Sequence, residues 1–173
     1  MNILPEMVAI LKRWETCVLT PYLEPDLVTW SYGYGHTGHS TGERVTEHTP
    51  PLKDEAAAHD ILMRDLTEHY GPQLDRLLAA EGVELNVYEW NAFLDILFNR
   101  GATRLRGSAA MWLLKQPDLK NYRKLAAEAI IISNRPGFAA LNTAKDRVTG
   151  EVVEKLGLTL RRIDDAALFQ TKL

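Results

Sequence analysis

The feature that most limits the possible folds is residues 15–38, where a helical pattern gives way to closely spaced turns. Before this segment, apolar side chains recur with helical spacing, at Leu4, Met7, Leu11 and Trp14. From residue 18 to residue 45, prolines and glycines separate short runs of β-forming residues, which predicts a small antiparallel hairpin or a three-stranded sheet. A chain of this kind needs a second, helical body to bury a core.

The rest of the chain has that helical character. Residues 54–69 carry an apolar face, Gly71-Pro72 predicts an interruption, and residues 73–80 resume the helix. Asn86 and Glu89 have the spacing of a capping box, and Ser108 and Asp118 are candidate caps. The further helices expected are 86–98, 108–115, 118–132 and one that starts near 159. The fold class is therefore α+β, with a mostly helical C-terminal lobe.

We interpret residues 1–173 as a single domain with two lobes. The β-containing lobe is residues 16–53, the helical lobe is residues 1–15 plus 72–173, and the connecting helix is residues 54–71. A length of 173 residues with 46% hydrophobic and 25% charged composition suits one such domain. Cys17 is the only cysteine, so an internal disulfide is excluded.

The charge pattern and the N-terminus exclude several classes of function. The net charge of -3 gives no sign of nucleic-acid binding. The N-terminal residues are too polar for a signal peptide or a membrane anchor, and no other apolar run reaches spanning length. We expect a protein that is made in the cytoplasm and does not insert stably into membranes.

Carboxylates are the chemically distinctive residues of segment 15–38. Glu15 follows the first helical pattern, and Glu24 and Asp26 lie in a turn next to Pro25. Acid/base cleavage of a glycosidic bond needs one carboxyl group that protonates the leaving oxygen and a second that stays ionised. The tight reversal of the chain would bring two such groups together, with the Ser31 hydroxyl close by.

Four stretches, in this order, resemble the bacteriophage lysozyme (endolysin) family, glycoside hydrolase family 24. They are Glu15 followed by WSYGYGHTG ending at Gly38, LKDEAAAHDILMRDL at 52–66, LFNRGATRLRGSAAMWLLKQPD at 97–118, and GLTLRRIDDAALF at 157–169. The resemblance covers almost the whole chain. It implies a lysozyme-like fold in which a long helix joins the hairpin-bearing lobe to the helical lobe.

The resemblance also implies catalytic roles, with departures from the family pattern. Glu15 matches the general acid. The family's Asp, eight residues further on, is replaced by Glu24, and its Thr by Ser31, which would help to place water. Asp26 is the alternative to Glu24 as the second carboxylate.

Other residues are assigned around this site. His36 matches a family histidine that pairs with an acid on the connecting helix, here Asp65, in a structural role. Trp30 and Tyr32 are candidates for stacking on sugar rings, and Arg104 is a candidate for binding substrate. Four other arginines are candidates for lining the saccharide cleft: Arg100, Arg106, Arg161 and Arg162. No metal site or cofactor is expected, since the pair His36 and His39 has no third ligand at a suitable spacing.

The expected function is peptidoglycan hydrolysis at the β-1,4 bond between N-acetylmuramic acid and N-acetylglucosamine, for phage-type lysis of a host. A monomer would act in the periplasm or cell wall after a separate membrane-permeabilising or delivery system released it. Two alternatives remain open: a lytic transglycosylase, and a catalytically impaired lysozyme fold that binds glycans or serves a structural role.

Overall fold

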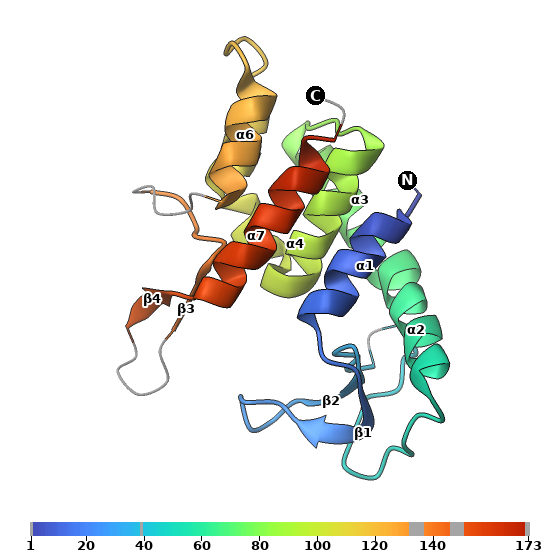
Figure 1. The fold of residues 1–173 in the computed structure, drawn as a ribbon. Helices are drawn as coiled ribbons and strands as arrows, with labels where there is room; N and C mark the ends of the chain where they lie inside the picture. The colour runs from blue at the N-terminus through green and yellow to red at the C-terminus, as the bar shows by residue number, and fades with distance from the viewer. Residues whose placement is uncertain (1, 39, 132–136, 146–150, 172–173) are drawn as a thin grey trace. The chain divides into compact units, whose positions relative to one another are not determined.

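The computed structural model describes residues 2–38, 40–131, 137–145 and 151–171. The chain forms two compact units, residues 11–72 and residues 1–10 with 73–173. Figure 1 shows the elements of both units along the chain. The helices and strands of the described residues are, in order, α1 (Pro5–Trp14), β1 (Val18–Leu23), β2 (Trp30–Gly33), α2 (Glu55–Arg64), η1 (Asp65–Tyr70), α3 (Gly71–Glu81), α4 (Val87–Arg106), α5 (Ala109–Leu114), α6 (Tyr122–Ile131), β3 (Thr143–Lys145), β4 (Val152–Glu154) and α7 (Leu156–Phe169). Among these residues no helix has the length and apolar character needed to cross a bilayer.

The unit of residues 11–72 contains the expected hairpin. Strands β1 and β2 pair antiparallel as a two-stranded sheet, and an isolated bridge between Tyr32 and His36 stands where a third strand was possible. The pairs Tyr22–Ser31 and Leu23–Trp30 are in regular register, but the register shifts between Val18 and Tyr22. Pro21 lies in that irregular part, consistent with its inability to donate a ladder hydrogen bond.

The helical connection after the hairpin is continuous, so the expected interruption at Gly71-Pro72 was wrong. Asp54 caps α2 by accepting from the backbone N–H of Ala57, and α2, η1 and α3 follow without a gap. The segment η1 is a π-helix, and the Gly71 N–H bonds to the carbonyl of Leu66, five residues back. We attribute the continuity to this wider turn, since proline disturbs the ordinary four-residue spacing and a π-turn adjusts it.

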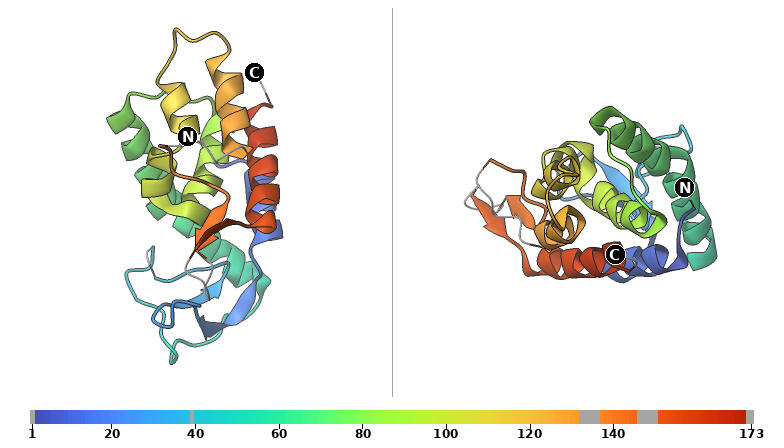
Figure 2. Two further views of the ribbon diagram at one scale, coloured as in Figure 1. Left: turned by 90° about the vertical axis from the view of Figure 1, so that its left-hand side faces the viewer. Right: turned by 90° about the horizontal axis from the view of Figure 1, so that it is seen from above.

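The helical unit is built around α4, whose middle is completely buried at Phe93, Leu94 and Leu97. Its start is the predicted capping box of Asn86 and Glu89. The expected end near Gly101 is a kink, because Gly101 has φ 77° and the helix then resumes to Arg106. Helix α7 packs along α4 and α6, as the second views show (Figure 2).

Two helix starts and one hairpin in this unit differ from the sequence prediction. Helix α6 begins at Tyr122 rather than at Asp118, after Asn121 with φ 59°, and its predicted end at residue 132 lies outside the described residues. Helix α7 begins at Leu156, slightly before the expected start. The hairpin of β3 and β4 was not predicted, because three-residue strands are too short to show an alternating pattern.

The proposed cleft roles of Arg161 and Arg162 were wrong. Both side chains are buried, and Arg161 donates to both carboxyl oxygens of Asp95, at 2.8 and 2.7 Å. Arg162 Nε lies 3.0 Å from Asp165 Oδ2. The buried guanidinium of Arg161 thus has its carboxylate partner on α4, whereas Arg162 and Asp165 are neighbours on α7.

Candidate active site

Glu24 and Asp26, the two candidates for the second carboxylate, have different roles in the turn between β1 and β2. Glu24 closes the turn through its backbone, since its N–H donates to the carbonyl of Thr29 at 2.7 Å. The carboxylate of Asp26 accepts from the N–H of Val28 and Thr29 at 2.9 and 2.8 Å, and from the Thr29 hydroxyl at 2.6 Å. These hydrogen bonds, that of the Thr29 hydroxyl first, hold the pKa of Asp26 below its usual value. Asp26 therefore stabilises the turn.

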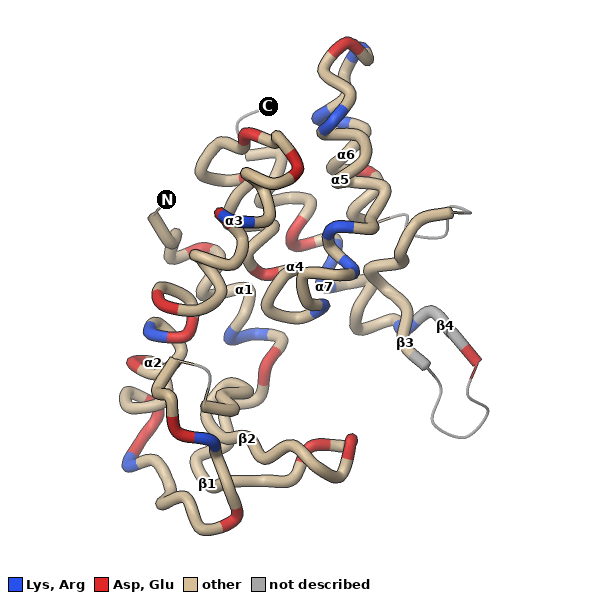
Figure 3. The backbone as a smooth tube through the Cα atoms, turned by 180° about the vertical axis from the view of Figure 1, so that it is seen from behind, with Lys and Arg blue, Asp and Glu red and all other residues tan. Residues whose placement is uncertain are grey.

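Acidic residues, drawn in red, lie at the tip of this hairpin (Figure 3). Leu27 has φ 62° in the same turn and is 74% exposed. The Asp26 contacts hold this unusual backbone in place. The side chain of Glu24, by contrast, is half-buried at the base of the turn.

Tyr22 brings the candidate catalytic residues together. Burial, the hydrogen bond and charge of Glu24, and the charge of Glu15 raise the pKa of Tyr22 to about 12. Ser31 is the cross-strand partner of Tyr22, so its side chain lies on the same face of the sheet. Glu15, Glu24 and Ser31 thus surround one phenol, and all of them belong to the unit of residues 11–72.

Glu15 lies directly after α1, where its N–H bonds to the carbonyl of Leu11 at 2.9 Å. Its side chain is half-buried, and its charge also acts on Tyr70. Burial, with the charges of Asp65 and Glu15, raises the pKa of Tyr70 to about 12. The charge of Glu15 thus reaches both phenols.

Ser31 is fully buried, and its hydroxyl oxygen makes no hydrogen bond of regular geometry with the described residues, although it lies close enough to the Tyr22 hydroxyl to offset part of the rise that burial causes in the pKa of that phenol. A buried hydroxyl without a partner loses favourable interaction free energy. Such a group is suited to hold a water or a substrate oxygen, in agreement with the role that the resemblance implies for it.

The expected contact between His36 and Asp65 is present. His36 Nδ1 lies 2.9 Å from both carboxyl oxygens of Asp65, and both side chains are buried. Ser40 donates a hydrogen bond of 2.5 Å to the same carboxylate. These hydrogen bonds join the loop after β2 to η1 and so hold that loop in place.

The candidate substrate residues lie in different units. Trp30 lines a pocket of about 370 Å³, and Tyr32 is half-buried with its ring 5.5 Å from that of His36. Arg104 belongs to the helical unit, where it donates to the carbonyl oxygens of Ala140 and Thr143 at 3.2 and 3.4 Å. Its role in substrate binding stays a prediction.

No cluster of metal-ligating side chains occurs in the part of the chain that the structure describes, and His39 is outside that part. Sequence reasoning missed Tyr22 and Tyr70. Tyr22 could have been found, since it lies two residues before Glu24 on a predicted strand and therefore shares its side of the strand.

Gly38 is essential for the loop that follows the hairpin. It has φ 107°, and a Cβ atom there would lie 2.2 Å from the carbonyl oxygen of Glu43. We expect Gly38→Ala to lower the free energy of unfolding by roughly 1–3 kcal/mol or more, measured by urea denaturation. Gly42→Ala is the control, since its φ is 74° but its Cβ would meet nothing within 4 Å. Equal losses for both variants would contradict the steric explanation.

Comparison with known proteins agrees with this architecture. The muramidase domain of SpmX from Asticaccaulis excentricus superposes with a TM-score of 0.73 at 20% identity, covering 98% of each chain. A mutant of P22 lysozyme has a TM-score of 0.65 at 25% identity and 99% coverage of both chains. An endolysin from Escherichia coli O157:H7 phage FAHEc1 has a TM-score of 0.69 at 21% identity, covering 100% of this chain and 96% of that one. The fold is therefore lysozyme-like.

The sequence itself identifies the family. The profile of the phage lysozyme family matches residues 12–163, which include the hairpin, the candidate site and most of the helical unit. The chain belongs to the phage lysozyme family, and this membership supports a peptidoglycan hydrolase activity. Among curated proteins, no sequence matches the chain.

Proposed function

We propose that this chain is an N-acetylmuramidase that hydrolyses the β-1,4 bond between N-acetylmuramic acid and N-acetylglucosamine in peptidoglycan. The observation that supports this most is that the charges of Glu15 and Glu24 act on one tyrosine, Tyr22, beside the unpartnered hydroxyl of Ser31. The family match supports the substrate class. Glycosidases work with two carboxyl groups at one bond, and this unit provides both.

In this proposal Glu15 is the general acid and transfers its proton to the glycosidic oxygen as the bond to the anomeric carbon breaks. Glu24 stays ionised and stabilises the positive charge that develops on the sugar. Ser31 accepts a hydrogen bond from the water whose oxygen bonds to the anomeric carbon. The proton that this water loses goes to the Glu24 carboxylate once the glycosidic bond has broken, and exchange with solvent returns Glu15 and Glu24 to their starting protonation states. Atoms and charge balance without a cofactor.

The proposed setting is phage-type host lysis. The protein would act as a monomer on the cell wall, after a separate membrane-permeabilising or delivery system gives it access. The family match supports the wall as its target.

The test is digestion of purified peptidoglycan, with the soluble products identified by mass. Muropeptides with reducing ends at N-acetylmuramic acid would support the proposal. Anhydro-muramyl products would identify a lytic transglycosylase instead. Binding without any soluble product, from a protein shown to be folded, would indicate a glycan-binding protein and overturn the proposal.

Substitutions of Glu24 and Asp26, the two candidates for the second carboxylate, are expected to have different effects. We expect Glu24→Gln to lower the hydrolysis rate by about 10²–10⁴-fold, because the amide cannot balance positive charge on the sugar. Asp26→Asn is expected to keep most of the activity and to lower the free energy of unfolding through the weakened turn. Rates of reducing-end release and urea denaturation measure the two effects. The reverse pattern of activities would assign the role to Asp26.

A further inference from the structure

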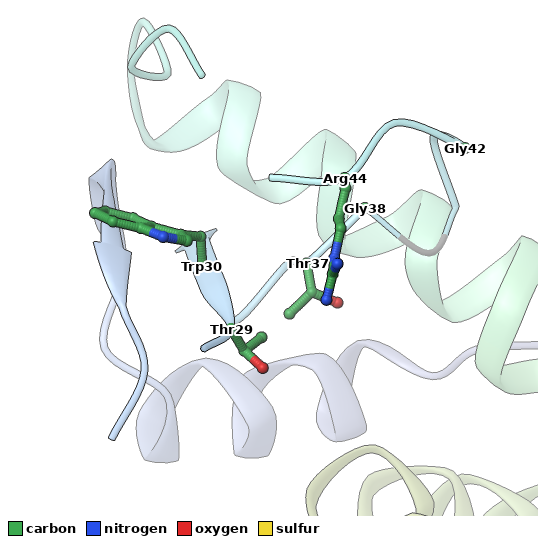
Figure 4. A pocket seen from close by; sticks show the side chains of 6 residues that line it. All are labelled: Thr29, Trp30, Thr37, Gly38, Gly42 and Arg44. Carbon is green, nitrogen blue, oxygen red and sulfur yellow. The ribbon is translucent and has the colours of Figure 1, made fainter. Parts of the chain in front are cut away.

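The pocket beside Trp30 has a composition that the reaction at Glu15 and Glu24 does not explain. Its volume is about 370 Å³, and it lies wholly within residues 11–72. Figure 4 shows the end of the Arg44 side chain beside Thr37, with Trp30 on β2 at the other side of the pocket and its ring extending away from Arg44. The residues that line it are Thr29, Trp30, Thr37, Gly38, Gly42 and Arg44.

Arg44 is held at this pocket by the backbone around it. The N–H of the next residue, Val45, donates to the carbonyl of Thr37 at 3.2 Å, and Val45 is only 4% exposed. The N–H of Gly42 donates to the carbonyl of Gly38 at 3.1 Å. The loop is thus closed on itself at two points. Little ordering of its backbone would be needed on binding a ligand.

Two polar side chains of the pocket, Arg44 and Thr37, lack partners among the described residues, whereas the Thr29 hydroxyl donates to Asp26. Arg44 makes no ion pair or hydrogen bond with the residues that the structure describes, although the unit is rich in carboxylates. The hydroxyl oxygen of Thr37 is also without a hydrogen-bond partner there. The unit holds five lysines and arginines against ten aspartates and glutamates. An anion is therefore attracted to this unit only where a cation such as Arg44 is available locally.

The pocket is offset from the bond that is cleaved. Trp30 pairs with Leu23, whereas Ser31 pairs with Tyr22 in the next position of the same ladder. Consecutive side chains of a strand point to opposite faces. Trp30 therefore lies on the other face of β2 from the reacting group, so the pocket receives a neighbouring part of the polymer rather than the reacting carbon.

We propose that this pocket binds a carboxylate on the muramic acid substituent of peptidoglycan, with Arg44 as the residue that recognises it. The guanidinium matches a carboxylate with two parallel hydrogen bonds, Thr37 can donate a third, and the Trp30 ring covers the aliphatic part of the substituent. This inference rests on the proposed function for its substrate. The carboxylate is that of a stem peptide, because the lactyl carboxyl group of a stem-bearing muramic acid is bound in an amide.

The test compares Arg44→Gln with wild type on three forms of one peptidoglycan: intact, with all carboxylates amidated, and with stem peptides removed so that only lactyl carboxylates remain. On the intact form we expect the variant to have a KM raised about tenfold with kcat nearly unchanged. On the amidated form wild type and variant should be equal. On the stem-free form, whose lactyl carboxylates are exposed only by removal of the stems, the difference should disappear. A difference that persists there would overturn the stem peptide as the source of the carboxylate.

Two further variants sharpen the result. Arg44→Lys keeps the charge but loses the two-pronged geometry, so its KM should lie between those of wild type and Arg44→Gln. Lys53→Gln removes one charge from an exposed side chain of the same unit and should leave KM unchanged. An equal rise in KM for Arg44→Gln on intact and amidated material, or no rise at all, would overturn the inference.

Failure of the proposed function can be separated from failure of this inference. Sedimentation of the protein with insoluble peptidoglycan measures binding without turnover. A wild type that cleaves nothing, but binds intact material about tenfold better than Arg44→Gln does, would remove the hydrolase proposal and support the carboxylate site.

Discussion

Replacement of Glu15 by Gln is expected to lower peptidoglycan hydrolysis by about 10²–10⁴-fold, down to the background of the assay. The amide has nearly the shape of the carboxyl group but cannot transfer a proton to the glycosidic oxygen. Glu15 is half-buried near Tyr22 and Tyr70, and the exchange keeps the side-chain volume of that site. We therefore expect the loss in kcat rather than in folding. Release of reducing ends from purified peptidoglycan measures it.

A matched control lies at the other end of the same helix. Glu6 is exposed in the first turn of α1, so Glu6→Gln makes the same chemical change without touching the site. We expect wild-type activity from Glu6→Gln and unchanged thermal unfolding for both variants. If Glu15→Gln kept more than a tenth of the activity while Glu24→Gln lost it, the acid would have to be another group.

The elements that the sequence predicted well depend on local interactions. The caps at Asn86 and Ser108 each need only residues two or three positions away, and both were found at helix starts. The hairpin likewise follows from a turn and two short runs beside it. The motif of segment 15–38 placed the candidate carboxylates for the same reason.

The parts that were missed depend on distant contacts. Arg161 and Arg162 look like surface charge because their partner Asp95 is more than sixty positions away in the sequence. Nor does a local pattern show that a π-turn at η1 lets the helix continue through Pro72. Tyr22 becomes part of the site only when Glu15 and Glu24 are brought near it by the fold. These features depend on tertiary packing between residues that are far apart in the sequence, and a single sequence contains little information about such contacts.

The buried charge cluster of the helical unit leads to the second large expected effect. Asp95 binds Arg161 through both of its carboxyl oxygens, and it is completely buried. We expect Asp95→Asn to lower the free energy of unfolding by about 3–5 kcal/mol, because a buried guanidinium is left without its counter-charge. Asp165→Asn, in the same cluster, is expected to be nearly neutral or stabilising. Urea denaturation with linear extrapolation measures both.

The difference between the two aspartates follows from their opposite pKa directions. Burial favours the neutral form of both carboxyl groups, but at Asp95 the hydrogen bonds and charge of Arg161 outweigh it and hold the pKa low. At Asp165, burial and then the charge of Asp95 raise the pKa well above its usual value. Asp165 therefore favours its protonated form, which Asn imitates. Asp95 is ionised, and Asn removes its charge.

The pH dependence of stability provides the stricter test of this cluster. Because the fold raises the pKa of Asp165, the stability from its bound proton is complete below the unfolded pKa of about 4 and is lost as the pH rises through the folded value. The advantage of Asp165→Asn over wild type should therefore grow as the pH rises above about 4. The contribution of Asp95 has the opposite sign, so the deficit of Asp95→Asn should shrink as the pH falls below about 4. Parallel pH profiles for wild type and both variants would show that the cluster does not hold this proton, and Asp165 would then have to be ionised beside Arg162.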